Sequence, residues 1–134
     1  PHCRKVVNIS SMAGVAGAAT MAAYSAAKAA VIGLTKTLAK EWGRYNVTVN
    51  CVAFGLIETR LTQEVSDGPK TIDVKGQALK VGLDPGSRNV MTMLTPLGRP
   101  GTPEEAAGAV YLFCIPESDY VSGQVLLCAG GLVT

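Results

Sequence analysis

The chain has 134 residues, the size of one domain with a single buried core. Its hydrophobic fraction of 48% excludes a disordered chain, and its charged fraction of 16% lies below the roughly 25% of an average soluble protein, which predicts surface buried against a partner chain or further sequence. The formal net charge of +2 comes from basic and acidic residues spread along the chain, so we expect no nucleic-acid partner, and the longest apolar run is too short and too charged to cross a membrane.

The first part of the chain predicts a strand, a helix and a second strand. The run RKVVNIS, from Arg4 to Ser10, is typical of a short buried strand, and VTVNCVA, residues 47–53, is typical of another. Residues 21–42 are rich in alanine and leucine, contain no proline and are followed by Gly43, which predicts a helix between the two strands. This order predicts a right-handed βαβ unit of a parallel sheet.

The connection from Thr59 to Thr95 is much longer than usual and mixes polar residues with glycine and proline. We interpret it as a lid or substrate loop at about residues 60–95. One short helix is expected inside it, near residues 71–81.

A second helix has clear start signals. Thr102 fits the N-cap, Pro103 the first helical position, and Glu105 completes a capping box, while Pro116 is expected to end the helix. The run GQVLLCAGG, residues 123–131, then predicts a third apolar strand between glycines.

Together these elements predict an α/β fold. Three parallel strands and two main helices match the C-terminal part of a Rossmann-like doubly wound parallel sheet, in which five or more strands are normal, so N-terminal strands are missing. The strand around residues 6–9 is expected to be paired on both sides, and the chain supplies only one neighbour. We therefore predict that residues 1–134 are the C-terminal half of a single domain.

The cysteines argue against a metal site. Cys3, Cys51, Cys114 and Cys128 lie far apart without a C-x-x-C pair, and His2 is the one histidine, so neither a zinc site nor a thioredoxin-like motif is expected. Reduced, buried cysteines in a cytoplasmic protein are the prediction. The sequence has no recognisable signal peptide. Because it begins at Pro1 without an initiator methionine, it is also compatible with a longer precursor.

Tyr24 and Lys28 are the residues most suggestive of chemistry. They are four residues apart, so a helix places them on one face, where an ammonium favours the phenolate form of a nearby tyrosine. Ser11 follows the first strand, at the carboxyl edge where ligands bind in open α/β sheets. A serine there could orient a carbonyl or an alcohol while the tyrosine exchanges the proton.

Other interpretations remain open at this point. A Y-x-x-x-K pair alone is most often a packed tyrosine and a solvated lysine, although the serine upstream and the small residues around Tyr24 favour catalysis. Ser10 is the second candidate for the serine, because two hydroxyls end the strand. No G-x-S-x-G elbow of a hydrolase occurs, and a dyad using His2 would place its base at a frayed terminus.

Four segments together carry a family resemblance: VVNISSMAG, YSAAK, VTVNCVAFGLIET and PLGRPGTPEEAAGAVYLF. In this order they resemble the short-chain dehydrogenase/reductase family, and they are most similar to its 3-oxoacyl-acyl-carrier-protein reductases. The resemblance implies an NAD(P)-dependent oxidoreductase that interconverts a carbonyl and a secondary alcohol. It implies Ser11 as the substrate-orienting hydroxyl, Tyr24 as the proton donor or acceptor, and Lys28 as the residue that activates the tyrosine and binds the nicotinamide ribose.

The resemblance also implies a cofactor-binding loop after the second strand. Gly55, Ile57 and Thr59 match residues that contact the nicotinamide carboxamide and the phosphates, whereas Phe54 stands where the family usually has a proline. Near the end of the chain, Ala129 replaces an acidic residue that is frequent before the paired glycines. Both departures put local contacts of the family in question.

The glycine-rich phosphate-binding turn of the family is absent from these residues, as are the residue that selects NAD or NADP and the helix asparagine of the proton relay. We therefore expect the chain alone to bind NAD or NADP weakly or not at all. The alternative is a non-catalytic fragment or oligomerisation module that lacks the cofactor-binding half. The resemblance further implies a small-molecule substrate and a homodimer or homotetramer.

Overall fold

The computed structural model describes residues 3–62, 70–81 and 85–132. Its helices and strands follow one another in this order: β1 (Arg4–Ser11), α1 (Met12–Ala16), α2 (Ala22–Trp42), η1 (Gly43–Tyr45), β2 (Val47–Phe54), β3 (Lys70–Val74), β4 (Gln77–Val81), α3 (Pro85–Leu94), α4 (Pro103–Tyr111), η2 (Pro116–Ser118) and β5 (Val125–Cys128).

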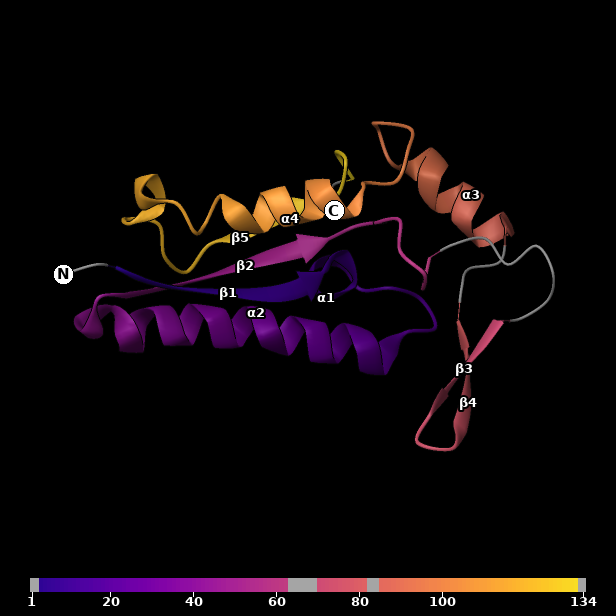
Figure 1. The fold of residues 1–134 in the computed structure, drawn as a ribbon, viewed down its shortest axis with the longest axis horizontal. Helices are drawn as coiled ribbons and strands as arrows, with labels where there is room; N and C mark the ends of the chain where they lie inside the picture. The colour runs from indigo at the N-terminus through magenta and orange to yellow at the C-terminus, as the bar shows by residue number, and fades with distance from the viewer. Residues whose placement is uncertain (1–2, 63–69, 82–84, 133–134) are drawn as a thin grey trace.

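The main sheet has three parallel strands in the order β1-β2-β5 (Figure 1). All three predicted strands and the parallel sheet are therefore confirmed, although β5 is shorter than the predicted run. It is bounded by glycines in the left-handed region, with φ of 76° at Gly123 and 61° at Gly130, and such residues do not continue a strand. The register pairs Ser11 with Phe54 and Phe54 with Cys128, so these three residues form one row at the carboxyl edge of the sheet.

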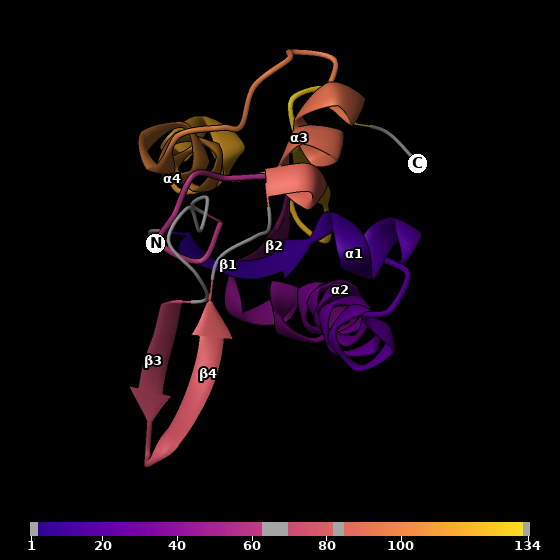
Figure 2. The ribbon, with the colours of Figure 1, turned by 90° about the vertical axis from the view of Figure 1, so that its right-hand side faces the viewer.

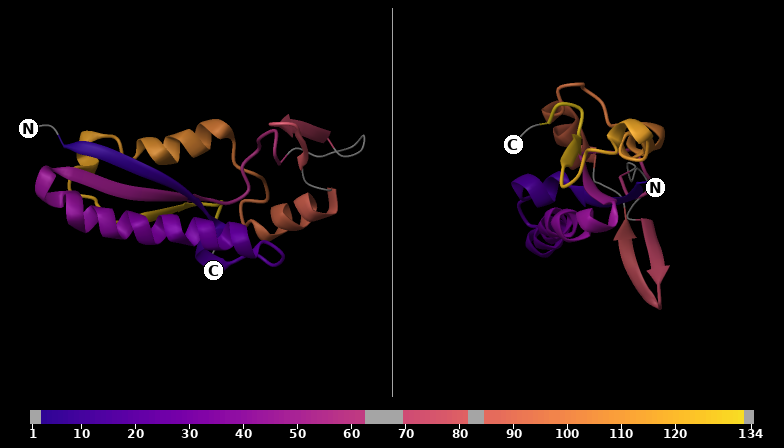
Figure 3. Two further views of the ribbon diagram at one scale, coloured as in Figure 1. Left: turned by 90° about the horizontal axis from the view of Figure 1, so that it is seen from below. Right: turned by 90° about the vertical axis from the view of Figure 1, so that its left-hand side faces the viewer.

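Helices cover both faces of this sheet. Helix α2 runs along β1 and β2 on one face, and α4 lies on the other face (Figures 2 and 3). On the α4 side, Val52 of β2 packs against Ala109 and Phe113 in a buried cluster. This is the layered arrangement of a Rossmann-like α/β fold.

Polar side chains of β1 hold α2 in place. Asn8 donates a hydrogen bond of 3.0 Å to the hydroxyl of Thr35, which is completely buried and donates to the Val31 carbonyl. Ser10, two residues further along the same face of β1, donates to the Lys28 carbonyl at 2.8 Å. These contacts fix the position of α2 along the sheet.

The predicted short helix near residues 71–81 is wrong, because β3 and β4 form an antiparallel hairpin there. Lys75 and Gly76 make its two-residue turn with φ of 55° and 81°, the positive values that a type I′ hairpin turn requires. Asp73 supports the turn by accepting a hydrogen bond from the Gly76 N–H at 2.9 Å. Within the rest of the predicted lid, α3 is an amphipathic helix, and residues 63–69 and 82–84 lie outside the described residues.

The start of α4 is as predicted, and its end is not. Thr102 and Glu105 form the complete capping box, but the helix ends at Tyr111 rather than at Pro116. The Phe113 N–H donates to the Val110 carbonyl at 3.1 Å, so the chain tightens into three-residue turns before Pro116 begins η2.

The four cysteines are free, and they are not all buried as predicted. Cys51 is buried in β2, and burial raises the pKa of its thiol. Cys114 is exposed instead, because it follows α4 in a tight turn at the surface, where its sulfur lies 3.6 Å from the Val110 carbonyl. Among the described helices none is long and apolar enough to cross a membrane.

Candidate functional site

The carboxyl end of β1 leads directly into the helix that carries the first candidate residue. Ser11 ends the strand and is the N-cap of α1, since its hydroxyl oxygen accepts a hydrogen bond of 3.2 Å from the Ala13 N–H. The five residues of α1 lie between the first predicted strand and the predicted helix of residues 21–42, where no helix was expected. Ser11 therefore stands at the sheet edge with its hydroxyl hydrogen still available to a ligand.

Tyr24 and Lys28 lie on one face of α2, as their spacing predicts. The Lys28 Nζ is 5.8 Å from the centroid of the Tyr24 ring and donates a hydrogen bond of 3.3 Å to the Ile9 carbonyl of β1. Tyr24 is 42% exposed, and its hydroxyl has no hydrogen-bond partner among residues 3–62, 70–81 and 85–132. The structure thus places the lysine beside the tyrosine ring, and the tyrosine hydroxyl stays available to a ligand.

The two serines at the end of β1 have different environments. Ser10 is 3% exposed, and its hydroxyl is occupied by the Lys28 carbonyl. Ser11 is partly exposed and is not hydrogen-bonded to Tyr24 in the part of the chain that the structure describes. Between the two candidates, Ser11 is the serine that a substrate can reach.

Gly14 is a residue of this site that sequence reasoning missed. A Cβ at Gly14 would lie 2.6 Å from the Lys28 carbonyl carbon and 2.8 Å from the Ala29 nitrogen, both of them backbone atoms of α2. Only glycine allows α1 to approach α2 so closely, beside the residue that carries the ammonium. The signal available in the sequence was a glycine three residues after Ser11, opposite a helix rich in alanine.

The loop after β2 begins with a second close approach. The Gly55 N–H donates to the Cys128 carbonyl at 3.0 Å, and a Cβ at Gly55 would lie 2.9 Å from the Cα of Ala129. Phe54, which replaces the usual proline, keeps its N–H, extends β2 by one residue beyond the prediction, and packs against the core cluster around Val52.

Ile57 forms an isolated parallel bridge with Gly101. The Gly101 N–H donates to the Leu56 carbonyl at 2.9 Å, and the Glu58 N–H donates to the Gly101 carbonyl at 2.8 Å. In this pattern the N–H and C=O of Ile57 itself point away from Gly101. The Thr62 hydroxyl donates a hydrogen bond to the Ile57 carbonyl, whereas the Ile57 N–H has no acceptor within the described ranges.

Thr59 is exposed at the next turn, where its N–H donates to the Thr62 hydroxyl at 2.8 Å. Arg88 of α3 reaches the same loop and pairs with the Glu58 carboxylate at 3.0 Å. The loop is therefore held both by α3 and by the bridge to Gly101.

A cavity of about 220 Å³ lies between this loop and the end of β5. Its walls include Ile57, Gly101 and Cys128, together with Arg99 and Glu105, whose side chains form a two-bond ion pair at 2.8 and 2.6 Å. The Arg99 guanidinium is the main reason that the pKa of Glu105 falls to about 2, and the hydrogen bond from the Thr102 N–H adds to it. Burial, with a smaller contribution from the Glu105 charge, raises the pKa of the Cys128 thiol.

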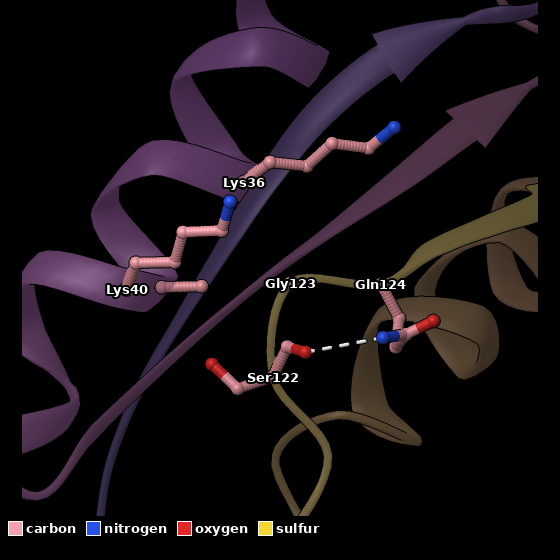
Figure 4. Close-up of a pocket in the computed structure, with 6 residues that line it drawn as sticks. Lys36, Lys40, Ser122, Gly123 and Gln124 are labelled. Atoms are coloured by element: carbon pink, nitrogen blue, oxygen red, sulfur yellow. Dashed lines mark hydrogen bonds between the residues drawn. The ribbon is translucent and has the colours of Figure 1, made fainter.

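A larger cavity of about 380 Å³ lies at the opposite edge of the sheet, between α2 and the turn that precedes β5 (Figure 4). Lys36 and Lys40 border it, and the Gln124 amide donates to the Ser122 carbonyl at 3.2 Å on its far side. It lies at the amino ends of the strands, whereas open α/β sheets bind ligands at the carboxyl ends, so the catalytic candidates are elsewhere. No group of three metal-binding side chains is found in the described part of the chain.

Comparison with known proteins gives consistent matches along nearly the whole chain. A family model for enoyl-(acyl carrier protein) reductase matches residues 2–133. The chain is 41% identical over 127 residues to a 3-oxoacyl-[acyl-carrier-protein] reductase of Chlamydia muridarum, covering 95% of this chain and 44% of the relative. It is 39% identical over 128 residues to the protein of the same description from Thermotoga maritima, covering 96% of this chain and 45% of the relative.

A solved structure agrees with these sequence matches. The crystal structure of a short chain dehydrogenase from Bacillus anthracis superposes with a TM-score of 0.70 at 32% identity, over 96% of this chain and 42% of that protein. The chain thus spans less than half the length of the relatives that it matches.

Proposed function

The chain belongs to the short-chain dehydrogenase/reductase family, and from this premise we propose that it is the C-terminal, catalytic half of a single Rossmann-like domain, residues 1–134, in an NAD(P)-dependent oxidoreductase. The reaction is the interconversion of a carbonyl and a secondary alcohol. The observation that supports this best is the meeting of Lys28 with Tyr24 at the end of β1, where Ser11 stands with an accessible hydroxyl.

Tyr24 exchanges the proton in this proposal. Its exposed phenol donates a proton to the substrate oxygen during reduction and takes one from the alcohol during oxidation. The Lys28 ammonium stabilises the phenolate that forms, and the Ile9 carbonyl holds this ammonium near the ring. Ser11 donates a hydrogen bond to the substrate oxygen and so orients it toward Tyr24.

The residues of the β2 loop fit a nicotinamide dinucleotide. The Ile57 N–H is a donor without an acceptor in the described residues, which suits a carboxamide oxygen, and Thr59 offers an exposed hydroxyl to a phosphate. Gly55 keeps the loop close to Ala129, and Lys28, whose Nζ lies 5.8 Å from the centroid of the Tyr24 ring, would hold the ribose. When bound, NAD or NADP supplies or accepts the hydride.

Replacing Tyr24 by phenylalanine tests the proposal. The test uses the completed domain, by which we mean this chain together with the glycine-rich half that the family resemblance implies, produced as one polypeptide or two. Tyr24→Phe removes the proton donor, so we expect kcat for NADPH- or NADH-dependent carbonyl reduction to fall by about 10²–10⁴-fold. Tyr120→Phe is the matched control, since Tyr120 is fully exposed and should leave the rate unchanged. Turnover retained by Tyr24→Phe would exclude the assigned role.

A second candidate is a non-catalytic fragment or oligomerisation module. It is favoured by the coverage of less than half of the relatives and by β1, which in the described residues pairs only with β2. Reductase activity of the completed domain separates the two candidates, because it is expected of a catalytic half and not of a non-catalytic module. For the chain alone, an unchanged fluorescence spectrum of NADPH or NADH would exclude an independent enzyme.

We also propose a homodimer or homotetramer and a cytoplasmic location. Exposed apolar side chains on α2 and β5, Leu34 at 52% and Leu127 at 38%, support subunit contacts through these two elements. The curated relatives bear names of reductases that act on acyl-carrier-protein substrates, so an oxoacyl thioester is the first substrate to test.

A further inference from the structure

The loop after β2 is held by Gly101, which lies two residues before α4. Gly101 is the residue whose N–H and carbonyl bond the chain on either side of Ile57, at 2.9 and 2.8 Å. Because both groups of Gly101 are used in this way, the direction of the free Ile57 N–H follows from the position of Gly101.

Gly101 is in turn fixed on both sides by a single carboxylate. On one side, the Arg99 guanidinium donates two hydrogen bonds to the Glu105 carboxylate, at 2.8 and 2.6 Å. On the other side, the Thr102 N–H donates to Glu105 Oε2 at 2.8 Å, and the Thr102 hydroxyl accepts from the Glu105 N–H at 3.2 Å. Arg99 also donates to the Pro100 carbonyl at 3.1 Å, so the segment that contains Gly101 is clamped from residue 99 to residue 102.

Gly101 is packed tightly between Ile57 and Glu105, so it has little room to move. A Cβ at Gly101 would lie 2.9 Å from Cδ1 of Ile57 and 3.8 Å from Glu105 Oε2, so bridge, isoleucine and carboxylate are packed together. All three line the same cavity of about 220 Å³ beside the carboxyl edge of the sheet.

We propose that Glu105 is a positioning residue for the cofactor: its carboxylate holds Gly101 from both sides, and Gly101 directs the Ile57 N–H toward the nicotinamide carboxamide. This role rests on the proposed function for its ligand, while the mechanical link from Glu105 to Ile57 exists without any ligand. A capping box alone would stabilise α4 and would have no effect specific to the loop after β2.

Amide hydrogen exchange on this chain tests the link without a cofactor. The informative reporter is the Glu58 N–H, which is protected only as long as the bridge to Gly101 is closed. Glu105→Gln keeps the capping hydrogen bond and loses the charge on which Arg99 depends, and we expect exchange at Glu58 to become about threefold faster. Glu105→Ala loses both contacts, and we expect about a tenfold increase.

Glu104 provides the matched control. It lies in the same first turn of α4, is exposed, and makes none of the contacts to residues 99–102 described above. Glu104→Gln should leave exchange at Glu58 unchanged. Equal exchange in Glu105→Ala, Glu104→Gln and the unaltered chain would overturn the proposal, as would an acceleration spread evenly over β1 and β2, because that would indicate general destabilisation.

The completed domain provides the functional readout. There, Glu105→Gln should raise the KM for NADPH or NADH about fivefold and change kcat by less than about twofold, since the proton donor is untouched. An unchanged KM would overturn the assignment to the cofactor even if the exchange result holds. An inactive unaltered domain would instead count against the proposed function, and the exchange result would still decide the link from Glu105 to Ile57.

Discussion

Gly14 determines how close α1 lies to α2. The 2.6 Å distance between a Cβ at this position and the Lys28 carbonyl carbon involves backbone, which cannot move aside as a flexible side chain can. We expect Gly14→Ala to push α1 from α2 and to reduce the free energy of unfolding by about 1–3 kcal/mol. Urea denaturation of the chain measures this change.

Gly33 is the control for that substitution. It lies within α2 with nothing within 4 Å of a Cβ, so Gly33→Ala should raise the stability by about 0.5–1 kcal/mol through its helix propensity. If Gly14→Ala were equally stabilising, α1 would not be packed on α2 in solution. In the completed domain Gly14→Ala should also lower the reductase rate, because Ser11 caps the helix that moves.

Glu105 makes the stability of the folded chain depend on pH. Its pKa in the folded protein, about 2, is below its ordinary value of 4.5, so the ionised form stabilises the fold fully above pH 4.5. This contribution is lost as the pH falls from 4.5 toward 2. We expect Glu105→Gln to remove part of the acid-induced loss of stability in this interval, and Glu104→Gln to retain it.

Urea midpoints measured at several pH values between 7 and 2 test this expectation. Because Arg99 and Glu105 are about half exposed, solvent and salt screen their interaction, and the difference between the variants should shrink at high ionic strength. Identical pH profiles for the chain and Glu105→Gln at low salt would contradict the ion pair.

At the scale of elements, β1 is paired with β2 along one edge, and along its other edge no strand of the described residues pairs with it. The Arg4 N–H donates to the Asn46 carbonyl, so in the parallel register the N–H groups of Val6 and Asn8 also face β2, and those of Val7 and Ile9 face the other side. We expect hydrogen exchange to alternate along β1, slow at Val6 and Asn8 and fast at Val7 and Ile9. Slow exchange at all four in the chain alone would mean that another strand, from a second copy, already covers this edge.

Local signals in the sequence were sufficient for the three parallel strands, for α2 and for the start of α4. Apolar runs, alanine content and a capping box act over a few residues and need no knowledge of the rest of the chain. The hairpin of β3 and β4 was missed because its turn uses a lysine with positive φ at position 75, which the residue type does not suggest. Helix α1 was missed because five residues depend on packing against α2 rather than on their own propensity.

In the candidate site, too, some features follow from local sequence and others depend on tertiary contacts. The spacing of Tyr24 and Lys28 follows from helix geometry and was predictable. The preference for Ser11 over Ser10 gains support only from the contact of Ser10 with the Lys28 carbonyl, and the proposed role of Gly101 rests on a bridge between segments distant in sequence. Such tertiary contacts leave no periodic pattern that sequence analysis could detect.

At the scale of the whole molecule, the described residues form a layered unit with the catalytic candidates at the carboxyl ends of the strands and with one edge of β1 unpaired. Figure 1 shows α3 and the β3–β4 hairpin beyond the carboxyl edge of the sheet, on the side of the catalytic candidates. The open edge of β1 faces the place where the family resemblance expects the glycine-rich half. In the proposed full domain, the residues proposed for proton transfer and the phosphate-binding turn would therefore meet across β1.

The strand order also has a consequence for the sequence of folding events. β1, α2 and β2 are contiguous in the chain, so their pairing closes a short connection, whereas β5 pairs Val125 with Cys51 and must wait for the distant end of the chain. During synthesis Ser11, Tyr24 and Lys28 can thus take their places while the residues of the Gly101 bridge are still being added. The face proposed for proton transfer forms early, and the loop proposed to contact the cofactor becomes ordered later.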